Sequence, residues 1–345
     1  MHANEEKIVN IYAWHGMITD EMIDEFQKET GIEVFVDFLD SNEVLEAKLL
    51  LGRSGYDVVF PSAWPYLARQ IPAGIYQKLD KSKLSNYKKI DKEAFDKLRP
   101  VDPQNEYVIA LTWGAIGYAY NADYVAKNFP DAPVDSFALF FDPEEIKKFS
   151  KCGVTMLEEA IDVFVPAFLY LGIDPDTTAK ADLDAAVKLL QNVRPYISKF
   201  DASRAQNEVM VNNMCLVQHW ISNLLMSFNE IPPNQRANVK IALPKEGAGM
   251  WIDTVAIPAD APHVDNAHKF VNFMLEPRNV ARISNATYCG NYVKESWVYI
   301  RDDVKHNKLI FPDKKYRDKL VLTAGNTPKY QRMMTRAMTK VRTGK

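Results

Sequence analysis

The first 60 residues alternate between strand-like and helix-like hydrophobic patterns. Lys7 to Ala13 is apolar and predicts a strand, and Thr19 then begins a capped helix that ends at Gly31. The same patterns predict a strand at 33–38, a helix from Ser41 to about Gly52 and a strand at 56–60. This alternation is typical of an α/β fold, in which helices cover both faces of a parallel sheet.

Later patterns predict a second lobe. Two apolar segments, 107–113 and 115–120, flank Gly114, and we interpret them as a crossover into that lobe. Helices are expected at 157–171 and 179–193 and strands at 214–218 and 239–243; a last helix, capped by Thr327, has an apolar stripe opposite a basic face that we expect to be solvated.

The segment 251–258 alternates apolar and polar residues and would return the chain to the first lobe. We therefore place the first lobe at residues 5–112 plus about 253–303. The second lobe takes residues 113–252 plus about 304–345. In such sheets ligands bind beyond the carboxyl ends of the strands, which directs attention to the loops that start at Trp14 and Ser62.

Composition narrows the class of partner. The 345 residues are 47% hydrophobic and 25% charged, with a formal net charge of -3, so neither nucleic acid nor an anionic membrane is expected as a partner. No apolar run reaches the roughly 18 residues of a membrane-spanning helix. The first residues show no export signal, which leaves a cytosolic protein or a mature exported one.

Catalytic and metal-binding motifs are missing from the sequence. It contains no HExxH, CxxC, GxSxG, P-loop or kinase motif, and its six histidines form no i, i+4 pair. We therefore expect no enzyme activity, no cofactor and no metal. Three cysteines are too few for a disulfide framework; they could be buried thiols, or one pair and a spare.

Tryptophans occur where the predicted strands end or turn. Trp14 follows the first strand, Trp64 follows the third, and Trp220 and Trp251 lie in the second half. If residues 251–258 form a strand, Trp251 and Asp253 point to the same side. A ring and a carboxylate on one side suit an organic cation, since a cation over an indole gains about 0.5–2 kcal/mol. Core or hinge positions are the structural alternative for each tryptophan.

At these residues the sequence resembles the spermidine- and putrescine-binding periplasmic proteins of bacterial ABC importers. The similarity extends over nearly the whole chain, and the closing segment is nearer the putrescine-binding branch. It is carried by Tyr12-Ala13-Trp14, Glu29-Thr30-Gly31-Ile32, residues 41–49, Tyr56-Asp57-Val58-Val59-Phe60-Pro61-Ser62, residues 79–84, residues 113–118, Pro244-Lys245-Glu246-Gly247 and residues 335–341.

The resemblance implies a type II periplasmic binding protein fold. Each lobe would be a mixed, mostly parallel sheet flanked by helices, and a hinged cleft would take up the ligand. It also implies a monomer in the periplasm that delivers putrescine or spermidine to membrane permease subunits. Another amine-containing solute, or a sugar, is the alternative ligand.

Carried over by position, the resemblance also implies the residues of the site. The aromatic walls would be Trp14, Trp64, Trp220, Trp251 and Tyr288. The polar ligand-binding groups would be Ser62, Asp162, Asp253 and, assisting, Glu159. For Asp162, an exposed helix carboxylate is the alternative role.

The chain departs from the family in two places that bear on specificity. His15, Gly16 and Met17 replace a small hydroxyl residue, an acid and a tyrosine, and Asn223 replaces an acid of the putrescine branch. A protonated His15 would oppose a cationic ligand, whereas a neutral one would make a hydrogen bond. The resemblance finally implies a disulfide between Cys152 and Cys215, with Cys289 free.

Overall fold

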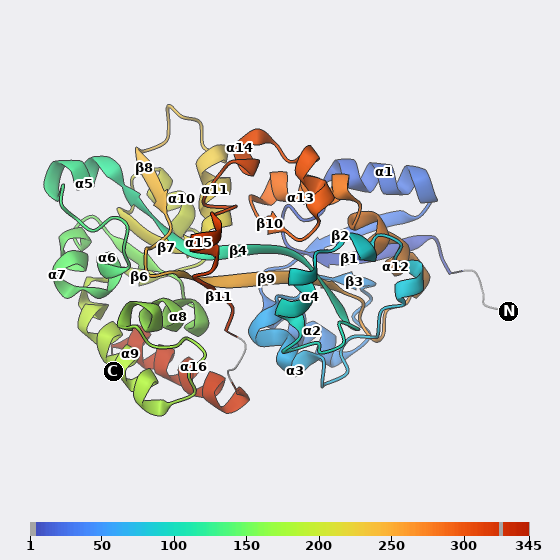
Figure 1. Cartoon of the computed structure of the whole chain (residues 1–345), viewed down its shortest axis with the longest axis horizontal. Helices are drawn as coiled ribbons and strands as arrows, with labels where there is room; N and C mark the ends of the chain where they lie inside the picture. Colours follow the sequence, from blue (N-terminus) through green and yellow to red (C-terminus); the bar gives the residue numbers. More distant parts are fainter. Residues whose placement is uncertain (1–4, 324–326, 345) are drawn as a thin grey trace. The chain divides into compact units, whose positions relative to one another are not determined.

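The computed structural model describes residues 5–323 and 327–344 and divides them into two compact units (Figure 1). The first unit contains residues up to 113 and residues 251–306, and the second contains residues 114–250 and those from 307 onward. The chain passes from one unit to the other three times, and two of these crossings lie inside strands, β4 (Val108–Asn121) and β9 (Ala248–Ala256). Trp251 and Ile252 thus belong to the first unit, although the sequence placed the boundary after residue 252.

The sheet of the first unit has the strand order β2-β1-β3-β9. β1 is parallel to both neighbours, β3 and β9 are antiparallel, and β10 pairs with β4. In Figure 1, α1 and α13 lie on one side of β1 and β2, and α2 and α3 on the other. The elements not yet bounded are β1 (Ile8–Ala13), α1 (Asp20–Thr30), β2 (Glu33–Phe38), α2 (Asn42–Leu51), β3 (Val58–Val59), α3 (Ala68–Gln70), α4 (Lys92–Leu98), α12 (Val264–Met274), α13 (Pro277–Thr287), β10 (Gly290–Asn291), α14 (Asp302–Lys305) and short helical segments at 63–67, 81–83, 87–89 and 294–299.

Helix α1 shows how the local sequence sets an element's limits. Thr19 Oγ1 accepts a hydrogen bond from the Met22 N–H at 3.3 Å, so a free donor at the start of the helix is satisfied. Gly31 ends the helix with a φ of 67°, in the left-handed region that glycine adopts at little cost. Between these ends, Phe26 is buried and meets Phe270 of α12 edge to face. The predicted limits of this helix are confirmed.

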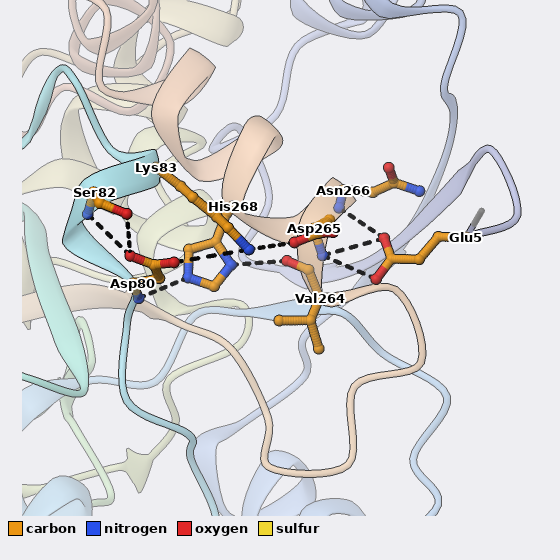
Figure 2. A network of polar contacts seen from close by, with 8 residues as sticks. All are labelled: Glu5, Asp80, Ser82, Lys83, Val264, Asp265, Asn266 and His268. Carbon is orange, nitrogen blue, oxygen red and sulfur yellow. Dashed lines mark hydrogen bonds and ion pairs between the residues drawn. The ribbon is translucent and has the colours of Figure 1, made fainter. Parts of the chain in front are cut away.

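A polar network fastens the start of the chain to α12 (Figure 2). The Glu5 carboxylate accepts hydrogen bonds from the backbone N–H groups of Asp265 and Asn266, at 3.0–3.1 Å, in the first turn of α12. One turn further on, His268 Nε2 accepts the Asp80 N–H at 2.9 Å. A carboxylate at a helix N-terminus is favourable because it accepts hydrogen bonds from N–H groups that have no partner within the helix. Its negative charge also interacts favourably with the positive end of the helix dipole.

The second unit has its own mixed sheet. β7 is antiparallel to β4 and parallel to β5, β5 is parallel to β6, and β8 is antiparallel to β4. β11 pairs in parallel with β9. Its elements are α5 (Ala122–Asn128), α6 (Ala138–Phe141), α7 (Pro143–Ile146), β5 (Val154–Met156), α8 (Ala160–Leu171), α9 (Lys180–Val193), β6 (Lys199–Phe200), α10 (Ala205–Met210), β7 (Leu216–Trp220), α11 (Ile221–Glu230), β8 (Val239–Ala242), α15 (Lys314–Arg317), β11 (Leu320–Val321), α16 (Pro328–Thr343) and short helical segments at 147–149 and 194–196.

Helices α8, α9 and α16 pack together and cover the core of this unit (Figure 1). The apolar stripe predicted for α16 is buried at Tyr330, Met334 and Met338, whereas Arg332 and Arg336 on its other face are exposed. The solvated basic face expected from the sequence is therefore confirmed. Thr327 Oγ1 accepts the Tyr330 N–H at 3.2 Å, so the predicted helix cap is also confirmed.

Some predicted strand limits were wrong. The two segments expected on either side of Gly114 form one strand of 14 residues, β4, because extended backbone continues through the glycine. The third strand, expected at 56–60, pairs only at Val58–Val59. The strand expected at 214–218 lies at Leu216–Trp220, since Met214 and Cys215 precede the paired residues.

Candidate functional site

The candidate site of the first unit is built around Asp253 in β9. Val59 pairs antiparallel with Ala256, and an isolated antiparallel bridge joins Ser62 to Asp253 further along. Thr254 secures this end of the sheet, because its N–H and its hydroxyl both donate to the Pro61 carbonyl, at 2.9 and 2.8 Å. Ser62 and Asp253, which are 191 positions apart in the sequence, therefore lie side by side.

Ser62 donates a hydrogen bond from Oγ to Asp253 Oδ1 at 2.6 Å. Asp253 is 8% exposed, and burial raises the pKa of its carboxyl group to about 7, although the Ser62 hydrogen bond opposes that rise. An acid that loses hydration in this way favours its neutral form until a cation arrives. An ammonium group beside it would restore the charged form, and a perturbed carboxyl of this kind is common at binding sites.

Three tryptophans of the first unit come from segments close to Asp253. Trp14 directly follows β1, Trp64 lies two residues after Ser62, and Trp251 precedes Asp253 by two residues on β9, so both point to one side of the strand. β1 and β3 are parallel neighbours, so the Trp14 and Ser62 loops leave the same edge of the sheet. The indole Nε1 of each ring is buried and has no hydrogen-bond partner in the described part of the chain.

His15 stacks on Phe38, which the sequence analysis did not select. The ring centres are 4.0 Å apart and the planes differ by 14°. His15 is exposed, and Phe38, the last residue of β2, is 45% exposed, so this pair presents a flat aromatic surface to solvent. Leu39, which follows Phe38, donates its N–H to the carbonyl of Ala13, which precedes Trp14, at 2.9 Å. The segment of Phe38 therefore lies next to the segment of Trp14 and His15. The sequence could have indicated Phe38, since it is the last residue of a predicted strand and candidate residues were sought where strands end.

Tyr288 also belongs to the first unit, where it ends α13 in the left-handed region at a φ of 55°. The Arg301 guanidinium lies 5.6 Å from the centre of its ring and donates to the phenol oxygen at 3.2 Å. Arg301 is in turn paired with Asp303 at 3.0 Å. The aromatic face expected to hold a ligand amine is therefore already in contact with a cation of the protein.

The candidate residues of the second unit gather at the ends of β5 and β7. Glu159 directly precedes α8, Asp162 lies in its first turn, and Trp220 is the last residue of β7. Buried Gln218 links these segments, because its Oε1 accepts the Leu157 N–H at 3.2 Å and its Nε2 donates to the Asp162 carbonyl at 2.9 Å. The start of α8 and the end of β7 are thus held together within this unit.

His219 supports Trp220 without adding charge. Its ring lies edge-on to the indole, with 5.1 Å between centres, and its Nδ1 accepts the Trp220 N–H at 3.0 Å. Burial lowers the pKa of His219 to about 4, so the imidazole is neutral at physiological pH and does not repel a cation there. Nearby, Asn223 Oδ1 accepts the Ser222 hydroxyl at 3.2 Å.

Cys152 and Cys215 form a disulfide with a Cα separation of 5.5 Å, and Cys289 is a buried thiol outside this pair. This is the pairing that the family resemblance implied. Cys152 lies just before β5 and Cys215 just before β7, which are parallel neighbours, so the bond joins the entrances of the two strands.

The described residues contain no group of three or more His, Cys, Asp or Glu side chains that could hold a metal ion. They also contain no helix of the length and apolarity needed to cross a membrane.

Comparison with known proteins identifies the family of the chain. A family model described as bacterial extracellular solute-binding protein matches residues 21–296. The chain is 40% identical to the putrescine-binding periplasmic protein SpuD of Pseudomonas aeruginosa, over 99% of this chain and 94% of that protein. It is 38% identical to the putrescine-binding periplasmic protein PotF of Escherichia coli, over 99% and 93%.

The fold agrees with a solved structure. The spermidine/putrescine ABC transporter substrate-binding protein PotD of Streptococcus pneumoniae superposes with a TM-score of 0.83 at 22% identity, covering 98% of this chain and 99% of that one. The predicted α/β binding-protein fold is thereby confirmed. With the family match and the two putrescine-binding relatives, these findings show that the chain belongs to the bacterial extracellular solute-binding proteins.

Proposed function

We propose that this chain binds a polyamine, putrescine or spermidine, in the periplasm and delivers it to the permease of an ABC importer. The observation that carries the proposal is the buried Asp253 carboxyl group, which is held by Ser62. The segments of these two residues also bear Trp251 and Trp64, and Trp14 follows the neighbouring strand β1. One ammonium group of the ligand would pair with Asp253, and the indole faces would cover its methylene chain. The relatives named above support the proposal.

In this proposal the second unit also carries groups of the kinds that bind amines. Glu159 and Asp162 are its acids, Trp220 is its ring, and Asn223 is a neutral hydrogen-bonding group. A charge-assisted hydrogen bond contributes about 1.5–3 kcal/mol and a cation over a tryptophan about 0.5–2 kcal/mol. A few such contacts give micromolar or better affinity after the entropic cost of binding. The capture involves no covalent chemistry.

A panel of solutes tests the class of ligand. Putrescine, spermidine, agmatine, glucose and glutamate would be compared by calorimetry and by thermal unfolding. A polyamine at 100 times its dissociation constant should raise the free energy of unfolding by about 2.7 kcal/mol. Stabilisation by glucose or glutamate, with no response to any amine, would reject the polyamine proposal.

The affinity for putrescine should fall as the pH is lowered below about 7. The ligand needs the ionised Asp253, whose pKa in the free protein is raised to about 7 by burial, while both ligand amines stay protonated throughout this range. Between pH 7 and pH 5, the dissociation constant should therefore rise by up to tenfold per pH unit. Calorimetry in matched buffers measures it, and a constant value from pH 5 to 8 would contradict the role of Asp253.

A further inference from the structure

Asn42 makes two hydrogen bonds to the residue that holds Asp253. Its Nδ2 donates to Ser62 Oγ at 3.0 Å, and its Oδ1 accepts the Ser62 N–H at 2.9 Å. Ser62 Oγ then donates to Asp253 Oδ1 at 2.6 Å. Asn42 is 9% exposed and lies in the first turn of α2, so helix, loop and strand are joined by one chain of hydrogen bonds.

The direction of these hydrogen bonds follows from their chemistry. A backbone N–H can only donate, so the Asn42 side chain must turn its oxygen toward the Ser62 N–H and its amide nitrogen toward Ser62 Oγ. The hydroxyl has a single proton; with the Asn42 amide donating to its oxygen, that proton is directed to Asp253 Oδ1. Asp253 Oδ2 receives no hydrogen bond from the described part of the chain and is left for a ligand.

Helix capping does not account for Asn42. Ser41 already caps α2, because its side-chain oxygen accepts the Val44 N–H at 3.2 Å. The Asn42 side chain points instead to Ser62, twenty positions away in the sequence. A buried amide that satisfies both its donor and its acceptor on one residue fixes that residue's position and its hydroxyl rotor together.

We propose that Asn42 is a positioning residue for ligand binding: it orients the Ser62 hydroxyl toward Asp253 Oδ1, which favours the ionised form of Asp253 and leaves its other oxygen for the ligand amine. The inference rests on the proposed function, because it assigns Asp253 to the ligand. It assigns no ligand contact to Asn42 itself, which acts through Ser62.

Asn42→Asp is the decisive variant. The carboxylate keeps the oxygen that accepts the Ser62 N–H but has no donor for Ser62 Oγ, so the hydroxyl can turn to residue 42 instead of Asp253. The dissociation constant for putrescine at pH 7 should rise about tenfold, and the midpoint of its pH dependence should move upward. The titration of the Asp253 carboxyl, followed by NMR on ligand-free protein, should move in the same direction.

Asn291→Asp is the matched control. Asn291 makes the same kinds of hydrogen bond elsewhere in the first unit, although to different residues: its Nδ2 donates to Ser284 Oγ at 2.9 Å, and its Oδ1 accepts the Val293 N–H at 2.9 Å and the Ser296 hydroxyl at 3.1 Å. This variant adds the same charge and removes the same kind of donor, but its serine does not contact Asp253. It should leave the dissociation constant and the Asp253 titration unchanged.

A double-mutant cycle separates positioning from the added charge. If Asn42 acts through Ser62, Asn42→Asp should cause little further loss of affinity in a Ser62→Ala background, whereas a plain charge effect would add in both backgrounds. Equal losses in the two backgrounds, equal effects of Asn42→Asp and Asn291→Asp, or an unchanged Asp253 titration would each overturn the inference. If the wild type bound no polyamine, the proposed function would fail, and the Asp253 titration would still decide whether Asn42 controls this carboxyl.

Discussion

Replacing Asp253 with asparagine is expected to weaken putrescine binding about 10- to 100-fold and, at the same time, to stabilise the fold at neutral pH. Asparagine has nearly the same shape and can still accept the Ser62 hydroxyl, so the change removes the charge and little else. A charge-assisted hydrogen bond of about 1.5–3 kcal/mol corresponds to that range of affinity. Calorimetry with putrescine measures the loss.

Stability rises while affinity falls because burial raises the pKa of Asp253 to about 7, above the 3.8 of an exposed aspartate. Between about pH 4 and pH 7 the folded state binds more protons than the unfolded state, so the free energy of unfolding falls as the pH rises through this window. At pH 7.5 the full cost is present, and Asp253→Asn should recover up to about 4 kcal/mol, measured by urea unfolding.

Asp260→Asn serves as the control for both measurements. Asp260 is exposed and accepts the Ser54 N–H at 3.1 Å, so this substitution changes the net charge equally without touching the Asp253 cluster. Its affinity and stability should stay near those of the wild type. If Asp253→Asn bound putrescine as tightly as this control, Asp253 would have no part in recognition.

Loss of the disulfide between Cys152 and Cys215 should produce the largest fall in stability. The bond closes a segment with a sequence separation of 63, and the loss of its constraint on the unfolded chain costs about 4 kcal/mol in the chain-entropy description. Serine at both positions, compared with the wild type in urea unfolding, measures this cost. The affinity for putrescine should change much less, because neither cysteine belongs to the candidate site.

Reducing agent provides the complementary test. It should lower the unfolding midpoint of the wild type and leave that of the double serine variant unchanged. Cys289→Ala should respond to reducing agent as the wild type does, since Cys289 is not part of the pair. A wild type indifferent to reduction would show that the bond does not support the fold.

The elements whose limits could be predicted carry their signals in their own sequence. α1 has Thr19 at one end and Gly31 at the other, and α16 has Thr327 and a clear apolar stripe. β4 was divided in error because it is buried along almost its whole length, so its pattern has no period of two that would show its continuity. Burial against partners distant in sequence, rather than local propensity, determines such a strand.

Only part of the candidate site could be anticipated in the same way. Trp251 and Asp253 are two residues apart on one strand, so strand periodicity was enough to place them on one side. Asn42 gave no such signal, because an asparagine at the start of a helix is usually a cap, and its partner Ser62 is reached only after the chain folds back through β3. The Arg301 contact with Tyr288 was equally beyond reach, since it depends on the turn after α13.

The position of the disulfide in the second unit bears on how the ligand preference of this protein could change. Cys152 and Cys215 clamp β5 and β7 where the strands begin, whereas Asp162 and Trp220 lie at the opposite end of the same two strands. In this unit the covalent cross-link and the residues proposed to bind the ligand thus lie at opposite ends of two strands. Under the proposed function, substitutions at the exits of these strands would change the preference for a longer or shorter amine and leave the cross-link at their entrances intact.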